Sequence, residues 1–283
     1  PGRGLIATAV KNPASQNTAT AIKCATQISP EQYAAMLSSN ALYTDLSGYY
    51  DLMCCDINYP AQSNTVHRLH QLLGNGGNTH LDLACGTAPH IRHFLDYGYQ
   101  SSGLDLNQPM LDLARARCPQ AHFMLQNMCS FTLDKPVDLI SCFLYSIHYS
   151  GNISQLKQCI ASAFAALNPG GLFCFNAVDK DKICNNSAVR HSTTHDDSHF
   201  VFESLWHYSG SGEQQALKLR IARTRAGNTQ LWQDEHAMVA ISFAQLQALL
   251  SPYFDVHILA HDYDKLLPWD SISGNALFAC IKR

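Results

Sequence analysis

The sequence has little charge and no long hydrophobic run. No stretch approaches the roughly 18 apolar residues of a membrane-spanning helix. Its 19 Lys and Arg stand against 22 Asp and Glu, for a net charge of -3 over 283 residues. Because nucleic acids and anionic membranes are bound by clustered positive charge, we expect neither as a partner.

Cysteines at the spacing of a metal or redox motif are also absent. None of the 11 cysteines forms a Cys-x-x-Cys motif, which argues against zinc ribbons and thioredoxin-like redox sites. Cys85, Cys142, Cys174 and Cys280 lie within apolar runs, where a free cysteine packs as a small hydrophobic side chain. This usage predicts a reduced, cytoplasmic protein.

One segment, "HSTTHDDSH" at residues 191–199, is rich in residue types that bind metals. On a helix, His191, His195 and His199 would share a face and could bind zinc. The Ser, Thr and Asp content of the segment instead favours a solvated loop. We therefore expect no metal site there.

Strand-like and helix-like segments alternate from residue 76 onwards. Strands are expected at 79–84, 101–106, 121–127, 137–146 and 172–178, and helices at 90–95, 110–116 and 153–167. The residues "NPGG" (168–171) are expected to end the last of these helices. Such alternation predicts an α/β fold with a doubly wound, mostly parallel sheet. Ligands of such sheets bind at the carboxyl ends of the strands, near the switch in strand order.

Composition divides the chain further. An Ala-, Thr-, Asn- and Ser-rich start predicts a mobile tail, and "SPE" at 29–31 is a helix start. After residue 180, three strand-like runs are separated by the turn sequences "SGSGE" and "AGN", which predicts an antiparallel excursion after the fifth strand. This excursion would cover the active site and could supply a dimer interface. We expect a tail at 1–28 and a helical cap at 29–75. The sheet domain is expected at 76–180 together with 242–283, and the antiparallel insertion at 181–241.

The stretch "HLDLACGTAP" (80–89) joins a buried strand to a turn with a single glycine. A loop that cradles phosphates needs several glycines, so the ligand need not be anionic at this turn. Asp105, at the end of the second strand, is placed to accept hydrogen bonds from two ribose hydroxyls. Asp82 can attract or orient a cationic amino group. A nucleoside that carries an amino acid and no phosphate, S-adenosylmethionine, fits both carboxylates.

On these residues the chain resembles the class I S-adenosylmethionine-dependent methyltransferases, and within them the subgroup that N-methylates amino groups of nucleotide-linked deoxysugars. The matching text is "YYDLM", "LDLACGTAPHIRHF", "GLDLNQPMLDLARARCPQAHF", "NMCSF", "SCFLYSIHY" and "NPGG". The resemblance implies a Rossmann-like fold whose last strand is antiparallel, S-adenosylmethionine as cofactor and a small-molecule acceptor.

The resemblance also assigns residues to the cofactor. Those expected to line it are Asp82, Ala84, Cys85, Gly86, Asp105, Leu106, Met110, Asn127, Met128 and Phe143. The chain departs from the family pattern in two places. Ala88 and Pro89 replace a glycine and its follower, which should stiffen the entrance to the next helix. Asn275 stands where sugar-amine relatives carry an arginine, which puts a contact to a nucleotide phosphate in doubt.

Methyl transfer from a sulfonium is an in-line displacement, to which positioning alone can supply about 7–11 kcal/mol. An amine acceptor must also lose its proton, and a neighbouring His or Tyr can assist. We expect His148, in "FLYSIHY", to be the base or the residue that orients the substrate. The full set of catalytic candidates is His148, Tyr149, Tyr145, Tyr50, Tyr43 and His236.

Three functions fit these residues. The first is methyl transfer to an amine nitrogen of a small molecule. The second is methyl transfer to a hydroxyl of a metabolite such as a phenol or a quinone. The third is a non-catalytic cofactor-binding or partner subunit that keeps the methyltransferase fold.

Overall fold

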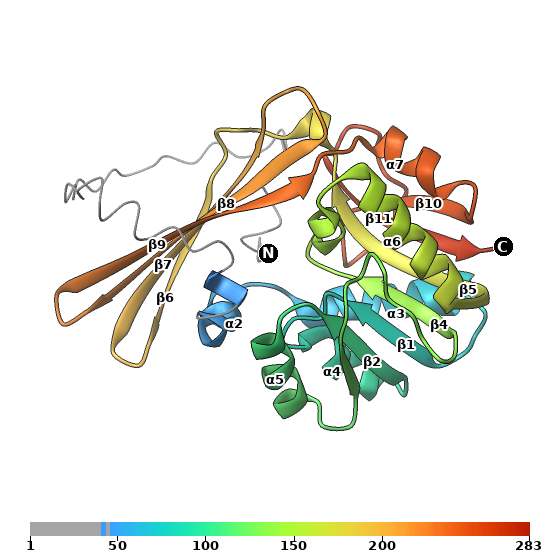
Figure 1. Ribbon diagram of the computed structural model, residues 1–283, viewed down its shortest axis with the longest axis horizontal. Coiled ribbons are helices and arrows are strands. Elements are labelled where there is room, and N and C mark those ends of the chain that lie inside the picture. The colour runs from blue at the N-terminus through green and yellow to red at the C-terminus, as the bar shows by residue number, and fades with distance from the viewer. Residues whose placement is uncertain (1–40, 44–45) are drawn as a thin grey trace.

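The computed structural model describes residues 41–43 and 46–283 (Figure 1). The tail expected over 1–28 and the helix start at 29–31 lie outside the described residues. Within the part of the chain that is described, every helix is too short or too polar to span a lipid bilayer.

A seven-stranded sheet forms the larger part of the molecule. Its strand order is β10-β11-β5-β4-β1-β2-β3. Neighbouring strands are parallel except at β11, which runs antiparallel to both β5 and β10. The doubly wound, mostly parallel sheet with an antiparallel last strand is therefore confirmed. The strands are β1 (Thr79–Leu83), β2 (Gln100–Asp105), β3 (His122–Leu125), β4 (Val137–Cys142), β5 (Leu167–Val178), β10 (Phe254–Ala260) and β11 (Asn275–Lys282).

Helices cover both faces of this sheet. The helices are α3 (Tyr59–Leu73), α4 (Pro89–Asp96), α5 (Gln108–Arg117), α6 (Ile153–Ala166) and α7 (Phe243–Leu250). α3, α4 and α5 pack side by side on one face, while α6 and α7 pack together on the other. Strand β4 is buried at every residue, as expected for a central parallel strand that is covered on both sides.

Alternation along β5 divides its side chains between two parts of the core. Phe173 and Phe175 pack in one apolar cluster with α6 and α7, and the Phe175 ring stacks on that of Phe278 at 5.2 Å between centroids. Leu172 and Cys174 pack in the cluster that includes α3. Because successive side chains of a strand point to opposite faces of the sheet, β5 packs against the helices on both faces.

The expectation that "NPGG" ends a helix is wrong in detail. α6 ends at Ala166, and residues 168–171 already belong to β5. Gly170 has a φ of 69°, and the pairing with β4 shifts register between Val137 and Leu139. The glycines therefore produce an irregularity within an extended strand rather than a separate turn.

A second sheet has four antiparallel strands in the order β6-β7-β8-β9, and it extends away from the larger sheet (Figure 1). Its strands are β6 (Val189–His195), β7 (Ser198–Tyr208), β8 (Gln214–Arg225) and β9 (Asn228–Val239). The sequence predicted three of these strands. It missed β6, the strand that pairs with the first half of β7.

Residues 191–199 are a tight hairpin and not the expected loop. Asp196 and Asp197 have φ values of 46° and 55°, the left-handed pair that a two-residue hairpin turn requires. Thr193 and Thr194 pair with Phe200 and His199 across the turn. Throughout residues 41–43 and 46–283, no group of three His, Cys, Asp or Glu side chains is arranged to hold a metal ion.

One apolar cluster, here called the junction cluster, joins the two sheets to the segment before α3. That segment contains the 3-10 turns η1 (Ala41–Tyr43) and η2 (Ser47–Tyr49) and the short helix α2 (Tyr50–Met53). The junction cluster includes Leu42, Leu46, Tyr50, Met53, Cys54, Ile57, Met110, Tyr145, Val178, Phe200, Phe202, Trp206, Leu217, Leu219, Ile221 and Met238. Segments that are far apart in sequence therefore meet above the carboxyl ends of the parallel strands.

Candidate active site

The carboxyl ends of β1 and β2 meet through a buried carboxylate. Asp105 ends β2, and its Oδ2 accepts a hydrogen bond from the Gly86 amide at 2.9 Å. Its Oδ1 accepts one from the Asn107 amide, also at 2.9 Å. Burial raises the pKa of Asp105, and these hydrogen bonds oppose the rise. The strand order reverses between β1 and β4, so this pair lies beside the switch point where such sheets bind ligands.

A second carboxylate, Asp82, lies within β1 and is 2% exposed. Its Oδ1 accepts a hydrogen bond from Ser141 Oγ at 2.7 Å, and His80 Nε2 donates to the same Ser141 oxygen at 2.8 Å. Burial raises the pKa of Asp82 to about 7; the bond from Ser141 opposes this rise and the charge of Asp105 adds to it. Burial lowers the pKa of His80 to about 3, so its ring is neutral.

The glycine turn has three left-handed residues: Ala84, Gly86 and Ala88 have φ values of 52°, 55° and 61°. A left-handed alanine costs about 1–2 kcal/mol, so surrounding contacts must hold this turn in place. A Cβ added to Gly86 would lie 3.4 Å from Met110 and 4.0 Å from the ring of Tyr50. These two side chains therefore flank the turn. Cys85 packs against Gly103 of β2, and its backbone is paired as well: its N–H donates to the Leu104 carbonyl and its carbonyl accepts from the Ala88 N–H, each at 2.9 Å.

A polar clamp that the sequence analysis missed ties α2 to the glycine turn. Thr87 Oγ1 donates to Asp51 Oδ1 at 2.7 Å. Arg117 donates to the Thr87 carbonyl at 2.8 Å and forms an ion pair with Asp51. All three residues lie within the quoted family motifs, but nothing in the sequence indicates that they contact one another.

Four side chains form a chain of polar contacts, here called the relay, between the cap and β9. The hydroxyls of Tyr43 and Tyr149 lie 2.7 Å apart, and the Tyr149 hydroxyl lies 2.6 Å from His236 Nδ1. His236 Nε2 lies 3.0 Å from Asp234 Oδ2, with poor alignment for a hydrogen bond, so this contact is electrostatic. Tyr43, Tyr149 and His236 were predicted from sequence, and Asp234 was missed.

The relay has a preferred direction. A carboxylate at Nε2 favours the His236 tautomer with its proton on that nitrogen, which leaves Nδ1 to accept from Tyr149. Tyr149 then accepts from Tyr43, and the Tyr43 oxygen keeps a lone pair for a ligand. Burial raises the pKa of both tyrosines far above the usual value, and Asp234 adds to the rise in each. Both hydroxyls therefore stay protonated at neutral pH.

His148 does not belong to the relay, and its expected role as base is wrong. It lies in η3 (Ser146–Ser150) and is fully buried. Its Nε2 accepts from the Val178 amide at 3.0 Å and its Nδ1 donates to the Val239 carbonyl at 2.9 Å. Burial lowers its pKa to about 4. With both ring nitrogens bound to backbone, His148 joins β5 to β9 and has no position free for a substrate.

Tyr145 also lies apart from the relay. It is 1% exposed, and its hydroxyl accepts from Asn275 Nδ2 at 3.1 Å and contacts His261 Nε2 at 3.3 Å. Its ring packs edge-on against Trp206 at 5.7 Å. Asn275 thus supports this ring and brings no positive charge to the site.

The residues expected near the adenine differ in exposure. Leu106 follows β2 and is 64% exposed, whereas Met128 is buried. Asn127 is exposed, and its Oδ1 already accepts from the Cys129 amide at 2.8 Å. Phe143 is buried and stacks on His90 at 3.6 Å between centroids.

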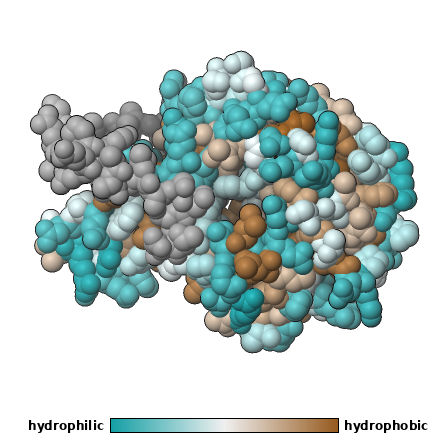
Figure 2. Space-filling model, viewed as in Figure 1, coloured by the Kyte–Doolittle hydropathy of each residue, from teal (hydrophilic) through white to brown (hydrophobic). Residues whose placement is uncertain are grey.

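The surface in Figure 2 is largely hydrophilic, with some hydrophobic side chains gathered near its centre.

The class I methyltransferase fold has this sheet order with an antiparallel last strand. It also has an acidic residue that accepts a hydrogen bond from the glycine-turn amide, as Asp105 does here. Residues 81–171 match the family described as "Methyltransferase domain". This segment is therefore a methyltransferase domain, and the resemblance drawn from its motifs is confirmed.

Curated relatives match over part of the chain. A dTDP-3-amino-3,4,6-trideoxy-alpha-D-glucopyranose N,N-dimethyltransferase of Streptomyces venezuelae is 30% identical over 114 residues, 40% of this chain and 48% of that protein. A dTDP-4-amino-2,3,4,6-tetradeoxy-D-glucose N,N-dimethyltransferase of Saccharopolyspora spinosa is 29% identical over 92 residues, 32% of this chain and 37% of that protein. The chain thus spans less than half the length of either relative.

Solved structures share the fold over most of the chain. Streptomyces venezuelae DesVI has a TM-score of 0.73 at 21% identity and covers 85% of this chain and 99% of its own. The sugar N-methyltransferase KedS8 from Streptoalloteichus has a TM-score of 0.72 at 17% identity, with 96% of this chain and 100% of its own covered. At these identities the likeness concerns the fold.

The structural role of His148 predicts a loss of stability in His148→Ala. The substitution leaves the Val178 amide and the Val239 carbonyl buried without their partner. We expect the free energy of unfolding to fall by about 2–5 kcal/mol, measured by urea denaturation. Ser146→Ala, in the same turn, should change it by less than about 1 kcal/mol. Equal stability of both variants would contradict the assignment.

Proposed function

We propose that the protein is an S-adenosylmethionine-dependent methyltransferase whose acceptor is the amine nitrogen of a small molecule. The observation that carries this proposal is the position of Tyr43, which ends the relay and whose ring lies 5.8 Å from that of Tyr50, the residue that flanks Gly86. The residues that flank the glycine turn and a proton-accepting chain therefore meet at one tyrosine. The matched relatives, which are named as N,N-dimethyltransferases of amino sugars, support an amine acceptor.

The residues at the glycine turn fit the cofactor. Asp105 has lone pairs left for ribose hydroxyls in addition to its two backbone bonds. Asp82 is a buried acid that a nearby ammonium group would hold ionised. Tyr50 and Met110 flank Gly86, where their soft and aromatic surfaces suit a sulfonium. When bound, S-adenosylmethionine supplies a methyl group on a cationic sulfur.

The relay would remove the proton from the acceptor. An amine with a pKa near 10.4 costs about 4–5 kcal/mol to deprotonate at pH 7. In this proposal its proton passes to Tyr43, while the Tyr43 proton moves to Tyr149 and that of Tyr149 to His236 Nδ1. Asp234 then stabilises the imidazolium, as the aspartate of a catalytic triad does. No tyrosinate persists, which agrees with the raised pKa values of both tyrosines.

The domain divisions keep a role in this proposal. The cap within 29–75 contributes Tyr43 and Tyr50 on the cofactor side, and the insertion 181–241 contributes Asp234 and His236 on the acceptor side. We place the reaction in a reduced, cytoplasmic setting because Cys85, Cys142, Cys174 and Cys280 are buried thiols. The outer part of the four-stranded sheet remains our candidate for a homodimer interface.

Cofactor binding is tested through Asp105. S-adenosylhomocysteine at about 100 times its dissociation constant should add about 2.7 kcal/mol of stability, or about 5 °C in Tm. Asp105→Asn should abolish the shift, because a neutral amide accepts ribose hydrogen bonds more weakly. Asp112→Asn, an exposed acid on α5, should retain it. A full shift in Asp105→Asn would overturn the cofactor site.

Asp82 predicts a pH dependence of that binding. A cationic amino group binds the ionised form, so protonation of Asp82 competes with it below its pKa of about 7. We expect affinity for S-adenosylhomocysteine to rise about tenfold from pH 6 to pH 8, measured by isothermal titration. Asp82→Asn should give a flat profile. A pH dependence that survives in this variant would show that another group is responsible.

Transfer itself is tested with isotopically labelled cofactor against panels of amines and phenols. We expect methylated amines, and we expect Tyr149→Phe to lower kcat by about 100-fold because it interrupts the relay. The KM for the cofactor should not change. Transfer to phenols alone would favour the O-methyltransferase alternative. Tight cofactor binding without transfer to any acceptor would favour a non-catalytic role.

A further inference from the structure

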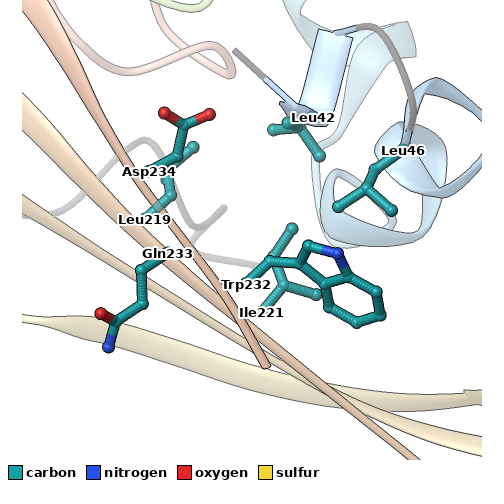
Figure 3. A pocket seen from close by; sticks show the side chains of 7 residues that line it. All are labelled: Leu42, Leu46, Leu219, Ile221, Trp232, Gln233 and Asp234. Atoms are coloured by element: carbon teal, nitrogen blue, oxygen red, sulfur yellow. The ribbon is translucent and has the colours of Figure 1, made fainter. Parts of the chain in front are cut away.

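Two carboxylates of the candidate site are held in different ways. Asp234 borders the contact between the cap and the four-stranded sheet, where Leu42 and Leu46 point toward the side chains of β8 and β9 (Figure 3). The cavity left in this contact is only about 10 Å³, about the volume that one water molecule needs. Apolar packing therefore closes that side of the site, whereas Asp82 is held by a hydrogen bond within the sheet.

Strand register brings three further polar side chains to Asp82. His80 and Asp82 are two residues apart on β1, so their side chains lie on the same face of the sheet. His80 pairs with Ser101 of β2, and Asp82 pairs with Ser141 of β4. Each of the four side chains is at most 6% exposed, so they depend on one another for hydrogen bonds.

These side chains form one continuous chain of hydrogen bonds. His80 Nδ1 lies 3.1 Å from Ser101 Oγ, and His80 Nε2 lies 2.8 Å from Ser141 Oγ. Ser141 Oγ in turn donates to Asp82 Oδ1 at 2.7 Å. The His80 ring packs against Phe94 at 4.0 Å between centroids, which fixes its position on the sheet.

The donors along this chain can be assigned from the carboxylate outward. An ionised Asp82 only accepts, so the single proton of Ser141 points to it. The Ser141 oxygen then accepts from His80 Nε2, which places the ring proton on that nitrogen. His80 Nδ1 is left to accept from the hydroxyl of Ser101. Every proton of the chain therefore points toward the carboxylate.

We propose that His80 is a positioning residue of the cofactor site: it holds the Ser141 hydroxyl toward Asp82 and so keeps that carboxylate ready for the ammonium end of the cofactor. The inference rests on the proposed methyltransferase function and adds a residue to it. Both ring nitrogens of His80 are used within the sheet. His80 therefore acts on the cofactor only through Ser141 and Asp82.

The chain has a second arrangement when Asp82 is protonated. Asp82 then donates to Ser141, whose proton turns to His80 Nε2, and the ring carries its own proton on Nδ1, toward Ser101. Each serine and the ring keep one proton in both arrangements, so the only net change is the proton on Asp82. The tautomer of His80 thus reports the charge of Asp82, and a cation bound there favours the ring with its proton on Nε2.

The ionisable groups around Asp82 are Asp105, Cys85 and Cys142. Burial raises the pKa of both thiols well above the usual value, so they stay protonated. Asp105 accepts two backbone hydrogen bonds, which favour its ionised form. Near neutral pH, the titration of the chain is therefore that of Asp82.

The groups around the His80 ring are His70, His90 and Tyr99. Burial lowers the pKa of both histidines and raises the pKa of Tyr99 to about 12, so all three stay uncharged. The His80 ring is itself neutral, because burial lowers its pKa to about 3. Its tautomer can change near neutral pH, but its charge does not.

Nuclear magnetic resonance of protein with isotope-labelled histidine tests the chain in wild type. We expect one ring to change from the Nδ1–H to the Nε2–H tautomer as the pH rises through about 7, the pKa of Asp82. This signal should be missing in His80→Gln. S-adenosylhomocysteine should move the change to lower pH, because its ammonium group favours ionised Asp82. A His80 ring that keeps one tautomer from about pH 6 to about pH 8 would overturn the inference.

Binding of S-adenosylhomocysteine to two variants tests the role of His80. His80→Phe keeps a ring against Phe94 but loses both hydrogen bonds, so the pH of half-maximal affinity should rise by about 1. Affinity should then fall by about fivefold at pH 7 but only about twofold at pH 8. A merely structural defect would lower affinity by the same factor at both. His80→Gln can still donate to Ser141 and accept from Ser101, and it should restore the affinity at pH 7.

Leu139→Ala is the matched control. Leu139 pairs with His80 across β4 and is fully buried, so its truncation should lower stability and leave the pH of half-maximal affinity unchanged. Tight binding by wild type and His80→Phe with the same pH dependence would overturn the role of His80 and leave the proposed function standing. A protein that binds no S-adenosylhomocysteine at any pH would overturn both.

Discussion

Burial of the junction cluster is the constraint on which the site depends. The parallel sheet supplies Asp82 and Asp105, whereas the relay residues come from the cap, η3 and β9. Leu42, Phe200 and Trp206 are each about 1% exposed in this cluster, and removing such surface from water stabilises the folded state by about 25 cal/mol per Å². Without this packing, Tyr43 and His236 would have no fixed position relative to the sheet.

The candidate site also contains three carboxylates that are mostly buried. Asp82, Asp105 and Asp234 have little exposed surface, and the clamp residue Arg117 is already paired with Asp51 at the rim. Carboxylates that are removed from water act through a lower effective dielectric and attract cations more strongly than surface acids do. A sulfonium and an ammonium group are both cations, so this field suits the two reactants of the proposed reaction.

Local patterns were enough to predict the central strands, because β1 and β4 are apolar runs that can be identified without knowledge of their neighbours. The glycine turn was predicted from its motif in the same way. Long-range partners were beyond such patterns. The sequence favoured His148 over His236 as the base, and only the hydrogen bond of His148 to a carbonyl 91 residues away shows that it is structural. Strand β6 was missed because its sequence is polar, like that of a loop. It becomes a strand only through its hydrogen bonds to the edge of β7.

The clamp of Asp51, Thr87 and Arg117 links the cap to the cofactor side of the site. It holds α2 against the glycine turn while Tyr50 flanks Gly86, so the cofactor side is closed by the protein's own contacts. The clamp therefore couples the position of the cap to that of the glycine turn, as loops that close over active sites do in many enzymes.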